Sequence, residues 1–464
     1  MTKLLFIIVF MLACQVPVLA QADLHDRIQQ FVQEKELHTS EVGIAVYDLT
    51  EQRLVFGYQD EKLFRPASVL KLLTAITALE QLGADYPFTT CVFATGNLKE
   101  GVLDGNLYVV GAMDAEFGEE DMESLANQLA QAGIRKVNGM LYGDVSMKDS
   151  LYWGAGWAWD DTPYYFQPYL SPLMYNKGVV EVSAKPTVAG EPADVQVRPA
   201  SGFYSLCNLT CSQKPSAGKF EVTRNWLDGG NEIRVSGHVG RFVKDRVNMY
   251  PSDGFFLHVF QEHLFRKGIE VKAYARGTCP LDSAVQMASC THLLRQVMGP
   301  ALKRSDNVNA EALFYQLAAG AGKRHVSAED AAAVILDKIE RLGYSPKQYR
   351  IADGSGVSPY NYITPQLLIG FLRDAYACPD IYKELLAALP LAGVDGTLRN
   401  RMKKGSAYKR VYAKTGSLTG VSSLAGYAVA ASGHRLAFAV INQNILKGAQ
   451  AKAFQNEFCA ILCK

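Results

Sequence analysis

The most constraining feature of the sequence is that strand and helix patterns at its two ends enclose a long segment of different texture. Residues 42–47 and 53–56 alternate as the two strands of a hairpin, and an apolar helix is expected over residues 68–82. Strands and a final helix return at the other end of the chain. They are expected over 411–415, 421–429, 435–442 and 449–462.

The middle of the chain, residues 84–245, consists mostly of short alternating segments separated by Gly, Pro and Asp. This pattern is typical of a β-rich region, with one helical insertion over 119–133. The sequence therefore predicts a discontinuous α/β (α+β) domain made of residues 21–83 and 246–464, interrupted by a β-rich insert over 84–245. Further helices are expected over 254–267, 290–299, 310–320 and 328–342.

The N-terminus has the features of a secretory signal peptide over residues 1–20. Lys3 precedes a short apolar stretch, and small residues lead up to Ala20. The alternative is a lipoprotein signal, in which Cys14 carries the lipid and anchors the chain to a membrane. The apolar stretch is too short to indicate a membrane span, and no later segment has the necessary length.

Charge gives no indication of a nucleic-acid partner. The chain contains 47 basic and 46 acidic residues, and removal of residues 1–20 takes away one basic group, Lys3. The remaining chain is then formally neutral, without the basic excess that binding to phosphates requires.

Cysteine content agrees with export. Without Cys14 the chain keeps an even number, eight, which indicates disulfides in an exported protein. The pairs expected from proximity in sequence are Cys207 with Cys211 and Cys279 with Cys290. The spacings differ from those of zinc motifs and no paired histidines accompany them, so neither a metal nor a cofactor is expected.

Three short motifs occur in a fixed order and can carry chemistry together. The first is Ser68 to Lys71 at the start of the apolar helix. A serine hydroxyl becomes a good nucleophile only when a nearby base takes its proton. Residues three apart share a helix face, so Lys71 can reach Ser68, and burial would favour the neutral form of the lysine. The start of a helix also offers backbone N–H groups to an oxyanion.

The other two motifs supply polar groups of complementary kinds. Ser305 and Asn307 are two residues apart and can face one cleft, where a hydroxyl can pass a proton and an amide can hold Lys71 or a substrate backbone. Lys414 and Thr415 lie on an expected strand beside Gly416, which permits close approach of a ligand. A cation and a hydroxyl there would bind the terminal carboxylate of a peptide.

The Ser-x-x-Lys pattern alone has little specificity. It also matches Ser216 to Lys219 and Ser406 to Lys409, which lie among loop-forming residues instead of opening an apolar helix. Ser68 differs by this context and by the order of the three motifs, which are found together in penicillin-binding proteins and class A β-lactamases.

Taken with four further segments, the motifs resemble the class C low-molecular-mass penicillin-binding proteins, the D-alanyl-D-alanine carboxypeptidase/endopeptidase family. The resemblance covers essentially the whole mature chain, and the long gap between Ser68 and Ser305 suits a family that inserts domains there. It implies a penicillin-binding protein/β-lactamase-like transpeptidase domain with an antiparallel sheet flanked by helices. The four segments are Arg65 to Lys71, Gly156 to Asp161, Asp353 to Ser358 and Leu389 to Leu398.

The resemblance also implies roles for individual residues. Ser68 would be acylated and Lys71 would accept its proton, while Ser305 and Asn307 would shuttle protons and position groups. The other implied roles are carboxylate binding by Lys414 and Thr415 next to Gly416, and an oxyanion hole formed by the N–H groups of Ser68 and Ser417.

Substrate preference beyond D-alanine is left open. Asp161 and Phe166 match a family position that can contact the side chain of a stem-peptide diamino acid, although an exposed turn residue and a core aromatic would explain them as well. Family members that bind such a side chain can use a basic residue and a glutamine where this chain has Pro359 and Thr419. That departure leaves a preference for diaminopimelate in doubt.

The resemblance implies a periplasmic enzyme whose partners are peptidoglycan stem peptides and β-lactams. Whether it trims a terminal D-alanine or cuts a cross-link is open, because both reactions use one acyl-enzyme. The alternatives are a β-lactamase or esterase with the same motifs, and a catalytically silent cell-wall binding protein. The intact Ser68, Lys71, Ser305, Asn307 and Lys414 argue against the silent protein.

Overall fold

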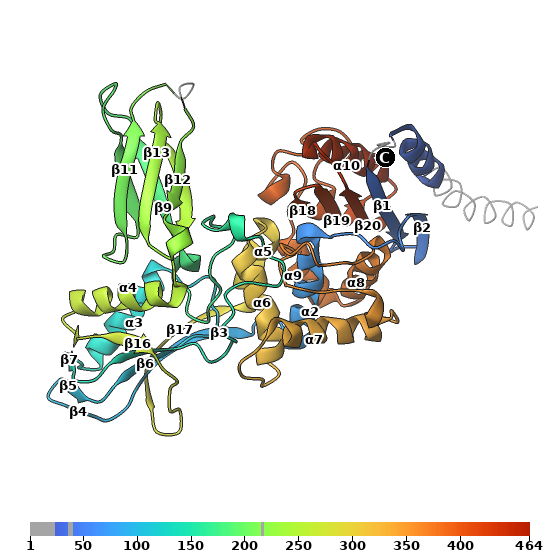
Figure 1. Cartoon of the computed structure of the whole chain (residues 1–464). Helices are drawn as coiled ribbons and strands as arrows, with labels where there is room; N and C mark the ends of the chain where they lie inside the picture. Colours follow the sequence, from blue (N-terminus) through green and yellow to red (C-terminus); the bar gives the residue numbers. More distant parts are fainter. Residues whose placement is uncertain (1–23, 36–39, 215–217) are drawn as a thin grey trace, which may run out of the picture. The chain divides into compact units, whose positions relative to one another are not determined.

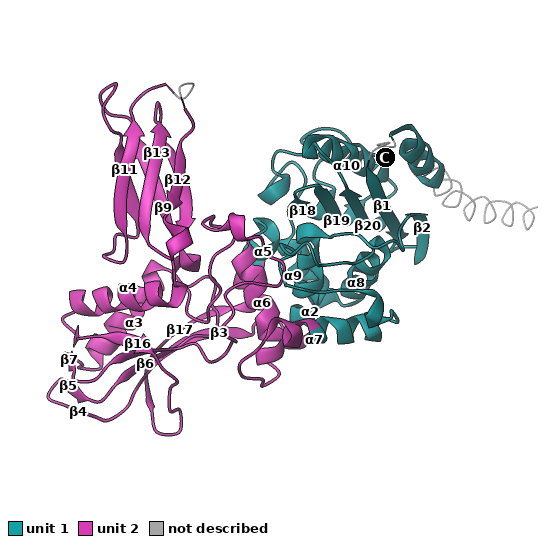
Figure 2. Cartoon of the chain, viewed as in Figure 1, with its two compact units in different colours: residues 1–80, 299–305, 333–464 teal, residues 81–298, 306–332 magenta. Residues whose placement is uncertain are grey.

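The computed structural model describes residues 24–35, 40–214 and 218–464 (Figure 1). The expected signal over residues 1–20, including Cys14, and Ser216 lie outside these ranges. The chain forms two compact units, each discontinuous in sequence (Figure 2). Unit 1 contains residues 1–80, 299–305 and 333–464, and unit 2 contains residues 81–298 and 306–332.

Unit 1 is built on a five-stranded sheet whose strand order is β18-β19-β20-β1-β2, with every neighbouring pair antiparallel. The first two strands of the chain therefore complete a sheet begun by the last three, and the antiparallel sheet that the resemblance implies is confirmed. The strands are β1 (Glu41–Asp48), β2 (Arg53–Tyr58), β18 (Val411–Leu418), β19 (Val421–Val429) and β20 (Arg435–Gln443).

Helices cover both faces of this sheet. On one face, Phe454 and Phe458 of α10 (Gly448–Leu462) join Leu424, Phe438 and other inward-facing strand residues in one apolar core. On the other face, α8 (Pro365–Ala377) packs on β1 and β20. Because these strands are covered on both sides, β19 is buried along almost its whole length instead of alternating.

The expected apolar helix after Pro66 is present, with one difference at its start. Residues Ala67–Leu70 form a 3-10 turn, η1, and the α-helix α2 spans Lys71–Leu82. Every residue from Lys71 to Leu79 is buried, in agreement with the apolar residues around the whole circumference. Ala67 has a φ of +51°, a left-handed conformation that alanine rarely adopts, immediately before Ser68.

Unit 2 contains the remaining sheets. Its largest sheet has the order β16-β8-β6-β3-β17 and mixes parallel with antiparallel pairs. Three smaller sheets have the orders β15-β7-β5-β4, β10-β9-β14 and β11-β13-β12. The strands of the largest sheet are β3 (Pro87–Ala94), β6 (Leu107–Val110), β8 (Leu141–Asp144), β16 (Tyr274–Arg276) and β17 (Val285–Leu293).

The smaller sheets consist of short strands, which confirms the β-rich texture of the middle segment. Their strands are β4 (Asn97–Lys99), β5 (Val102–Asp104), β7 (Lys136–Val137), β9 (Val179–Lys185), β10 (Asp194–Arg198), β11 (Ser205–Cys211), β12 (Glu221–Arg224), β13 (Glu232–His238), β14 (Val243–Asn248) and β15 (Glu270–Val271).

Two helices bury their apolar faces in the core of unit 2. Leu125 and Leu129 of α3 (Glu119–Gln131) and Phe256 and Phe260 of α4 (Ser252–Arg266) contribute to one cluster with Val109 and other strand residues. Helix α3 is the insertion expected over 119–133. Unit 2 extends beyond residue 245 because α4, β15, β16 and β17 complete its sheets and core.

The later helices agree with expectation except for one. Helix α6 (Asn307–Ala319) and helix α7 (Ala328–Arg341) lie where they are expected. The prediction of a helix over 290–299 is wrong for its first four residues. Cys290 to Leu293 continue β17, and α5 spans Leu294–Lys303. Within the described ranges, no helix is both long and apolar enough to cross a bilayer.

The expected disulfides are not formed. All eight cysteines that the structure describes have free thiols. Cys207 and Cys211 lie four residues apart on the same strand, β11, a separation of about 13 Å along an extended chain, whereas a disulfide requires Cα atoms within about 7 Å. The thiol of Cys290 instead donates to Asp121, and the backbone N–H of Cys279 donates to Asp144.

Candidate active site

Ser68 lies in the 3-10 turn that leads into α2, and Lys71 is the first residue of the α-helix. One turn separates them, so the two side chains share a face, and the Lys71 ammonium lies 2.9 Å from Ser68 Oγ. Lys71 is only 1 % exposed. The sequence prediction that this lysine reaches the serine from a buried position is confirmed in geometry.

A backbone carbonyl fixes the orientation of Lys71. Its Nζ donates to the carbonyl oxygen of Ser355 at 2.6 Å, in the segment that follows Asp353. The Asp353 carboxylate in turn accepts from the N–H groups of Gly356 and Ser358 and so shapes this loop. The sequence of this segment indicates the family resemblance but does not predict Ser355 as a partner of Lys71.

A second serine–lysine pair forms in unit 1. Lys414 on β18 donates to Ser305 Oγ at 2.7 Å and to the carbonyl oxygen of Thr415 at 2.6 Å. Its side chain is fully buried, and burial together with the nearby charge of Lys71 lowers the pKa of Lys414 well below its usual range. Ser305 adopts a left-handed φ of +60°, a strained conformation for a serine.

Close backbone approach connects β18 with the nucleophile turn. A Cβ at Gly416 would lie 2.1 Å from Ser423 Oγ and 2.9 Å from the backbone nitrogen of Ser68. The Ser423 hydroxyl donates to the carbonyl oxygen of Pro66 at 2.6 Å, which ties β19 to the same turn. Gly416 is therefore required by space, although the atoms that approach it belong to Ser423 and the nucleophile turn, whereas the sequence led us to expect a ligand there.

β18 is an edge strand of the five-stranded sheet, and its neighbouring positions differ in exposure. The Thr415 side chain is partly exposed, and its hydroxyl donates to Thr397 Oγ1 at 2.8 Å. Ser417 is exposed. Thr397 lies in the Leu389 to Leu398 segment and is a second contact that sequence reasoning missed. The structure thus brings Thr415 and Thr397 together beside the buried Lys414.

The Ser-Asp-Asn motif is divided between the two compact units, with Ser305 in unit 1 and Asn307 in unit 2. Asp306 is the N-cap of α6, because its carboxylate accepts from the N–H of Asn309. Asn307 begins the helix, and its amide donates to the carbonyl oxygen of Phe166 at 2.8 Å. The motif therefore both caps α6, through Asp306, and supplies a side-chain amide that forms a hydrogen bond, through Asn307.

Asp161 ends a short 3-10 turn, η2 (Trp159–Asp161), within unit 2. Partial burial, with a smaller effect of Asp160, raises the pKa of its carboxyl group. Phe166 follows shortly afterwards and its ring stacks on that of Tyr164. Through the Asn307–Phe166 hydrogen bond, the segment that contains Asp161 is joined to the start of α6.

Among the described residues, the rival match at Ser406 is bonded to a backbone carbonyl instead of a lysine. Its hydroxyl donates to the carbonyl oxygen of Ala460 at 2.7 Å, so it serves to hold α10 against a loop. Ser68 differs in having a buried ammonium within hydrogen-bond distance.

Three features define an active-site serine enzyme of the penicillin-binding type. They are a serine at the entrance of a buried helix, a lysine one turn later, and a second lysine, on the edge strand of an antiparallel sheet, that donates to a second serine. Residues 24–463 match the D-Ala-D-Ala carboxypeptidase 3 (S13) family. The chain belongs to this family and is a serine-type D-Ala-D-Ala carboxypeptidase.

Individual relatives agree with the family. The chain is 32% identical over 454 residues to a D-alanyl-D-alanine carboxypeptidase of an Actinomadura species, covering 92% of this chain and 83% of the relative. It is 28% identical over 412 residues to D-alanyl-D-alanine carboxypeptidase DacB of Haemophilus influenzae, covering 86% and 84%. The crystal structure of penicillin binding protein 4 (dacB) from Haemophilus influenzae superposes with a TM-score of 0.80 at 25% identity, covering 93% of this chain and 98% of that one.

Proposed function

We propose that the chain releases the terminal D-alanine of peptidoglycan stem peptides through an acyl-enzyme formed at Ser68. The observation that carries this assignment is the 2.9 Å contact between Lys71 Nζ and Ser68 Oγ at a buried helix entrance. The neutral amine of Lys71 takes the hydroxyl proton as Ser68 Oγ attacks the carbonyl carbon of the penultimate D-alanine. The carbonyl oxygen of Ser355 holds the lysine in place for this transfer.

The second serine–lysine pair supplies the leaving group's proton. When the tetrahedral intermediate collapses, the C–N bond breaks and the departing amine of D-alanine must be protonated. Ser305 Oγ, 2.7 Å from Lys414 Nζ, is placed to pass that proton and to regain it from the lysine. Asn307, two residues further along the chain, would position the substrate backbone or Lys71. Water then attacks the carbonyl carbon of the ester and gives a proton to the Ser305–Lys414 pair. The C–O bond to Ser68 breaks, and Ser68 Oγ takes back the proton that Lys71 held.

Substrate recognition is assigned to β18. An extended peptide can add to an edge strand by backbone hydrogen bonds, and the N–H groups of Ser68 and Ser417 would form the oxyanion hole. Thr415 is partly exposed, whereas Lys414 is fully buried, so the threonine hydroxyl would meet the terminal carboxylate first. The arriving negative charge would raise the lowered pKa of Lys414 again, and the lysine would then attract the carboxylate as an ammonium group. Asp161 would contact the amino group of a stem-peptide diamino acid.

β-Lactams would acylate Ser68 as substrate analogues, consistent with the penicillin-binding name of the Haemophilus influenzae structure. Residues 1–20 would export the enzyme to the periplasm or cell wall, where peptidoglycan is found. Endopeptidase cleavage of cross-links would use the same acyl-enzyme, since only the leaving amine differs.

The lifetime of a penicillin adduct tests this function against its rivals. The purified enzyme is incubated with a fluorescent penicillin, and both the adduct and D-alanine release from an acyl-D-Ala-D-Ala peptide are followed. A long-lived adduct together with D-alanine release supports the carboxypeptidase. Rapid turnover of penicillin without D-alanine release would identify a β-lactamase, and no adduct at all would identify a silent binding protein.

A further inference from the structure

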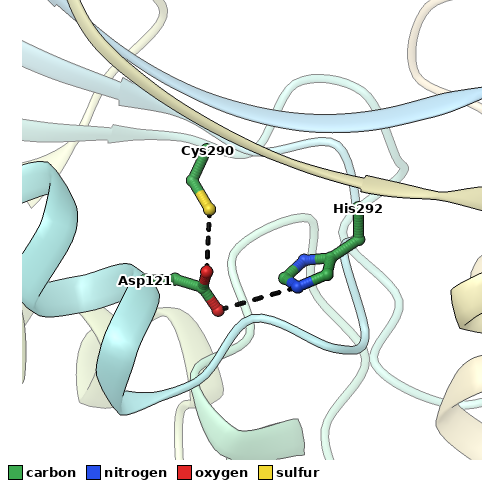
Figure 3. A group of neighbouring side chains, drawn as sticks. All are labelled: Asp121, Cys290 and His292. Carbon is green, nitrogen blue, oxygen red and sulfur yellow. Dashed lines mark hydrogen bonds and ion pairs between the residues drawn. The ribbon is translucent and has the colours of Figure 1, made fainter.

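A cysteine, a histidine and an aspartate converge in unit 2 at a place that the carboxypeptidase chemistry does not use (Figure 3). Asp121 belongs to the first turn of α3, and Cys290 and His292 belong to β17. One ligand atom of each, a carboxylate oxygen, Sγ and an imidazole nitrogen, lie within 4.8 Å of one another. We propose that these three side chains bind a divalent transition-metal ion of the zinc class.

The secondary structure explains why the three groups meet. Cys290 and His292 are two apart on a strand, so both side chains point to the same face of the sheet. Helix α3 packs on that strand, and the Gln128 amide holds it there by accepting from and donating to the backbone of Ser289. The positions of the three side chains are thus set by a strand and a helix instead of by a loop.

The distances are close to those of a coordination shell. Cys290 Sγ lies 2.8 Å from Asp121 Oδ1, and His292 Nε2 lies 4.0 Å from Asp121 Oδ2. In a tetrahedral zinc site with bonds of about 2.0 to 2.3 Å, neighbouring ligand atoms are about 3.5 Å apart. Side-chain shifts of about 1 Å would therefore bring sulfur, nitrogen and oxygen to bonding distance of one ion, with a fourth position open to water.

The hydrogen-bond partners that usually orient metal ligands are already present for both His292 and Asp121. His292 Nδ1 lies 2.7 Å from the carboxylate of Asp114, which is 1 % exposed, so Nε2 is the ring nitrogen turned toward Asp121. The carboxylate of Asp121 also accepts from the N–H of Gly118 at 2.8 Å through Oδ2, leaving Oδ1 toward Cys290. A carboxylate behind a ligating histidine fixes its tautomer and raises its basicity.

Charge around the cluster also suits a cation. The first turn of α3 carries Glu119, Glu120 and Asp121, which offset the positive end of the helix dipole. The Cys290 thiol donates its proton to Asp121, and an ion that binds would replace that proton. A thiolate, an imidazole and a carboxylate together are borderline-soft ligands, which zinc and its neighbours favour over magnesium or calcium.

Cobalt provides a spectroscopic test on the whole protein. The metal-free enzyme is titrated with Co²⁺ and then with Zn²⁺, and we expect one equivalent of Co²⁺ to give a thiolate-to-cobalt charge-transfer band that Zn²⁺ abolishes. Cys290→Ser and His292→Gln should weaken Zn²⁺ binding by more than the roughly tenfold to hundredfold loss expected for Asp114→Asn, which removes only the orienting carboxylate.

Cys91→Ser is the matched control. Cys91 lies on β3 directly opposite Ser289, so its side chain is on the other face of the sheet from Cys290. This variant should bind Zn²⁺ as the wild type does. The absence of a charge-transfer band, or equal affinities in the Cys290→Ser and Cys91→Ser variants, would overturn the proposal.

Thiol alkylation answers the question in the wild-type chain and does not depend on whether a variant folds. Zn²⁺ should slow the alkylation of Cys290, as measured by mass spectrometry of its peptide, and leave that of Cys91 unchanged. If both thiols react at the same rates with and without Zn²⁺, the cluster is a hydrogen-bonded network and not a metal site. Neither result bears on the carboxypeptidase assignment, which uses Ser68.

Discussion

Two buried lysines in unit 1 have different partners and hence different proposed tasks. Lys71 contacts the nucleophile Ser68, and Lys414 contacts Ser305. Two ammonium groups close together in a buried place disfavour each other's charge, which agrees with the lowered pKa of Lys414. The lowered pKa favours the neutral form of Lys414 before substrate binds. A substrate carboxylate beside Lys414 would restore its charge and leave Lys71 as the neutral base.

Replacement of Lys414 by alanine tests its proposed role in binding the substrate carboxylate. A charge-assisted interaction is worth about 2 kcal/mol, so Lys414→Ala should lower kcat/KM roughly thirtyfold on a peptide that ends in free D-alanine. The loss should be clearly smaller on the same peptide with an amidated C-terminus. Steady-state kinetics of both forms with wild type and variant give the comparison.

Equal losses on the free and the amidated peptide would contradict this role. Lys414 would then act through Ser305 or through the charge state of Lys71, which its burial and its 2.7 Å contact with Ser305 would allow.

At the scale of single residues, the sequence was sufficient to predict which serine and lysine meet. Ser68 and Lys71 are local in the chain, and an apolar helix fixes their relation. Ser355 and Thr397 were missed because they act through a backbone carbonyl and through a hydroxyl brought close by tertiary packing. The sequence indicates that the two segments matter, but nothing in it indicates which residue of each segment makes the contact.

At the scale of elements, the site depends on how closely β18 approaches the turn that carries Ser68. Gly416 permits this approach, since any side chain there would meet Ser423 Oγ and the backbone of Ser68 and Pro66. The lack of a side chain at Gly416 thus allows the edge strand to lie in contact with the nucleophile turn.

Gly416→Ala should separate the strand from the nucleophile turn. The added methyl group overpacks a rigid contact, with an expected cost of about 1–3 kcal/mol in the free energy of unfolding and a marked fall in the rate of penicillin acylation. Gly448→Ala is the control, because a Cβ there meets nothing within 4 Å. Denaturant unfolding and acylation rates of the two variants would be compared; equal behaviour would refute the close-approach argument.

Elements with a clear periodicity of apolar residues were predictable from the sequence. Elements that form only by pairing with a distant strand were not. The apolar run of α2 left no alternative to a buried helix. β17 was assigned in part to a helix, because the residues around Cys290 fit helical spacing and pair with β3 only in the folded sheet. That error concealed the alternation that places Cys290 and His292 on one face. The expected Cys207–Cys211 disulfide was wrong for the same kind of reason, since β11 extends the chain between them.

At the scale of the whole molecule, the chain ends build one sheet and the segment between them builds a second unit. The antiparallel sheet of unit 1 joins residues about 400 positions apart, such as Glu41 and Gln443. The pattern of strands at both ends predicted that the ends share one domain, but it did not predict which strands pair. The extent of unit 2 was not predictable in the same way, because α4 and β15–β17 resemble elements of either unit until their packing is known.

The central claim is that Ser68 carries the acyl group, and peptide mapping of the penicillin adduct tests it most directly. The enzyme is acylated, digested and analysed by mass spectrometry, alongside the variants Ser68→Ala and Ser406→Ala. We expect the adduct on the peptide that contains Ser68, no adduct and no D-alanine release in Ser68→Ala, and unchanged labelling in Ser406→Ala. An adduct on any other serine, or normal labelling of Ser68→Ala, would contradict the account.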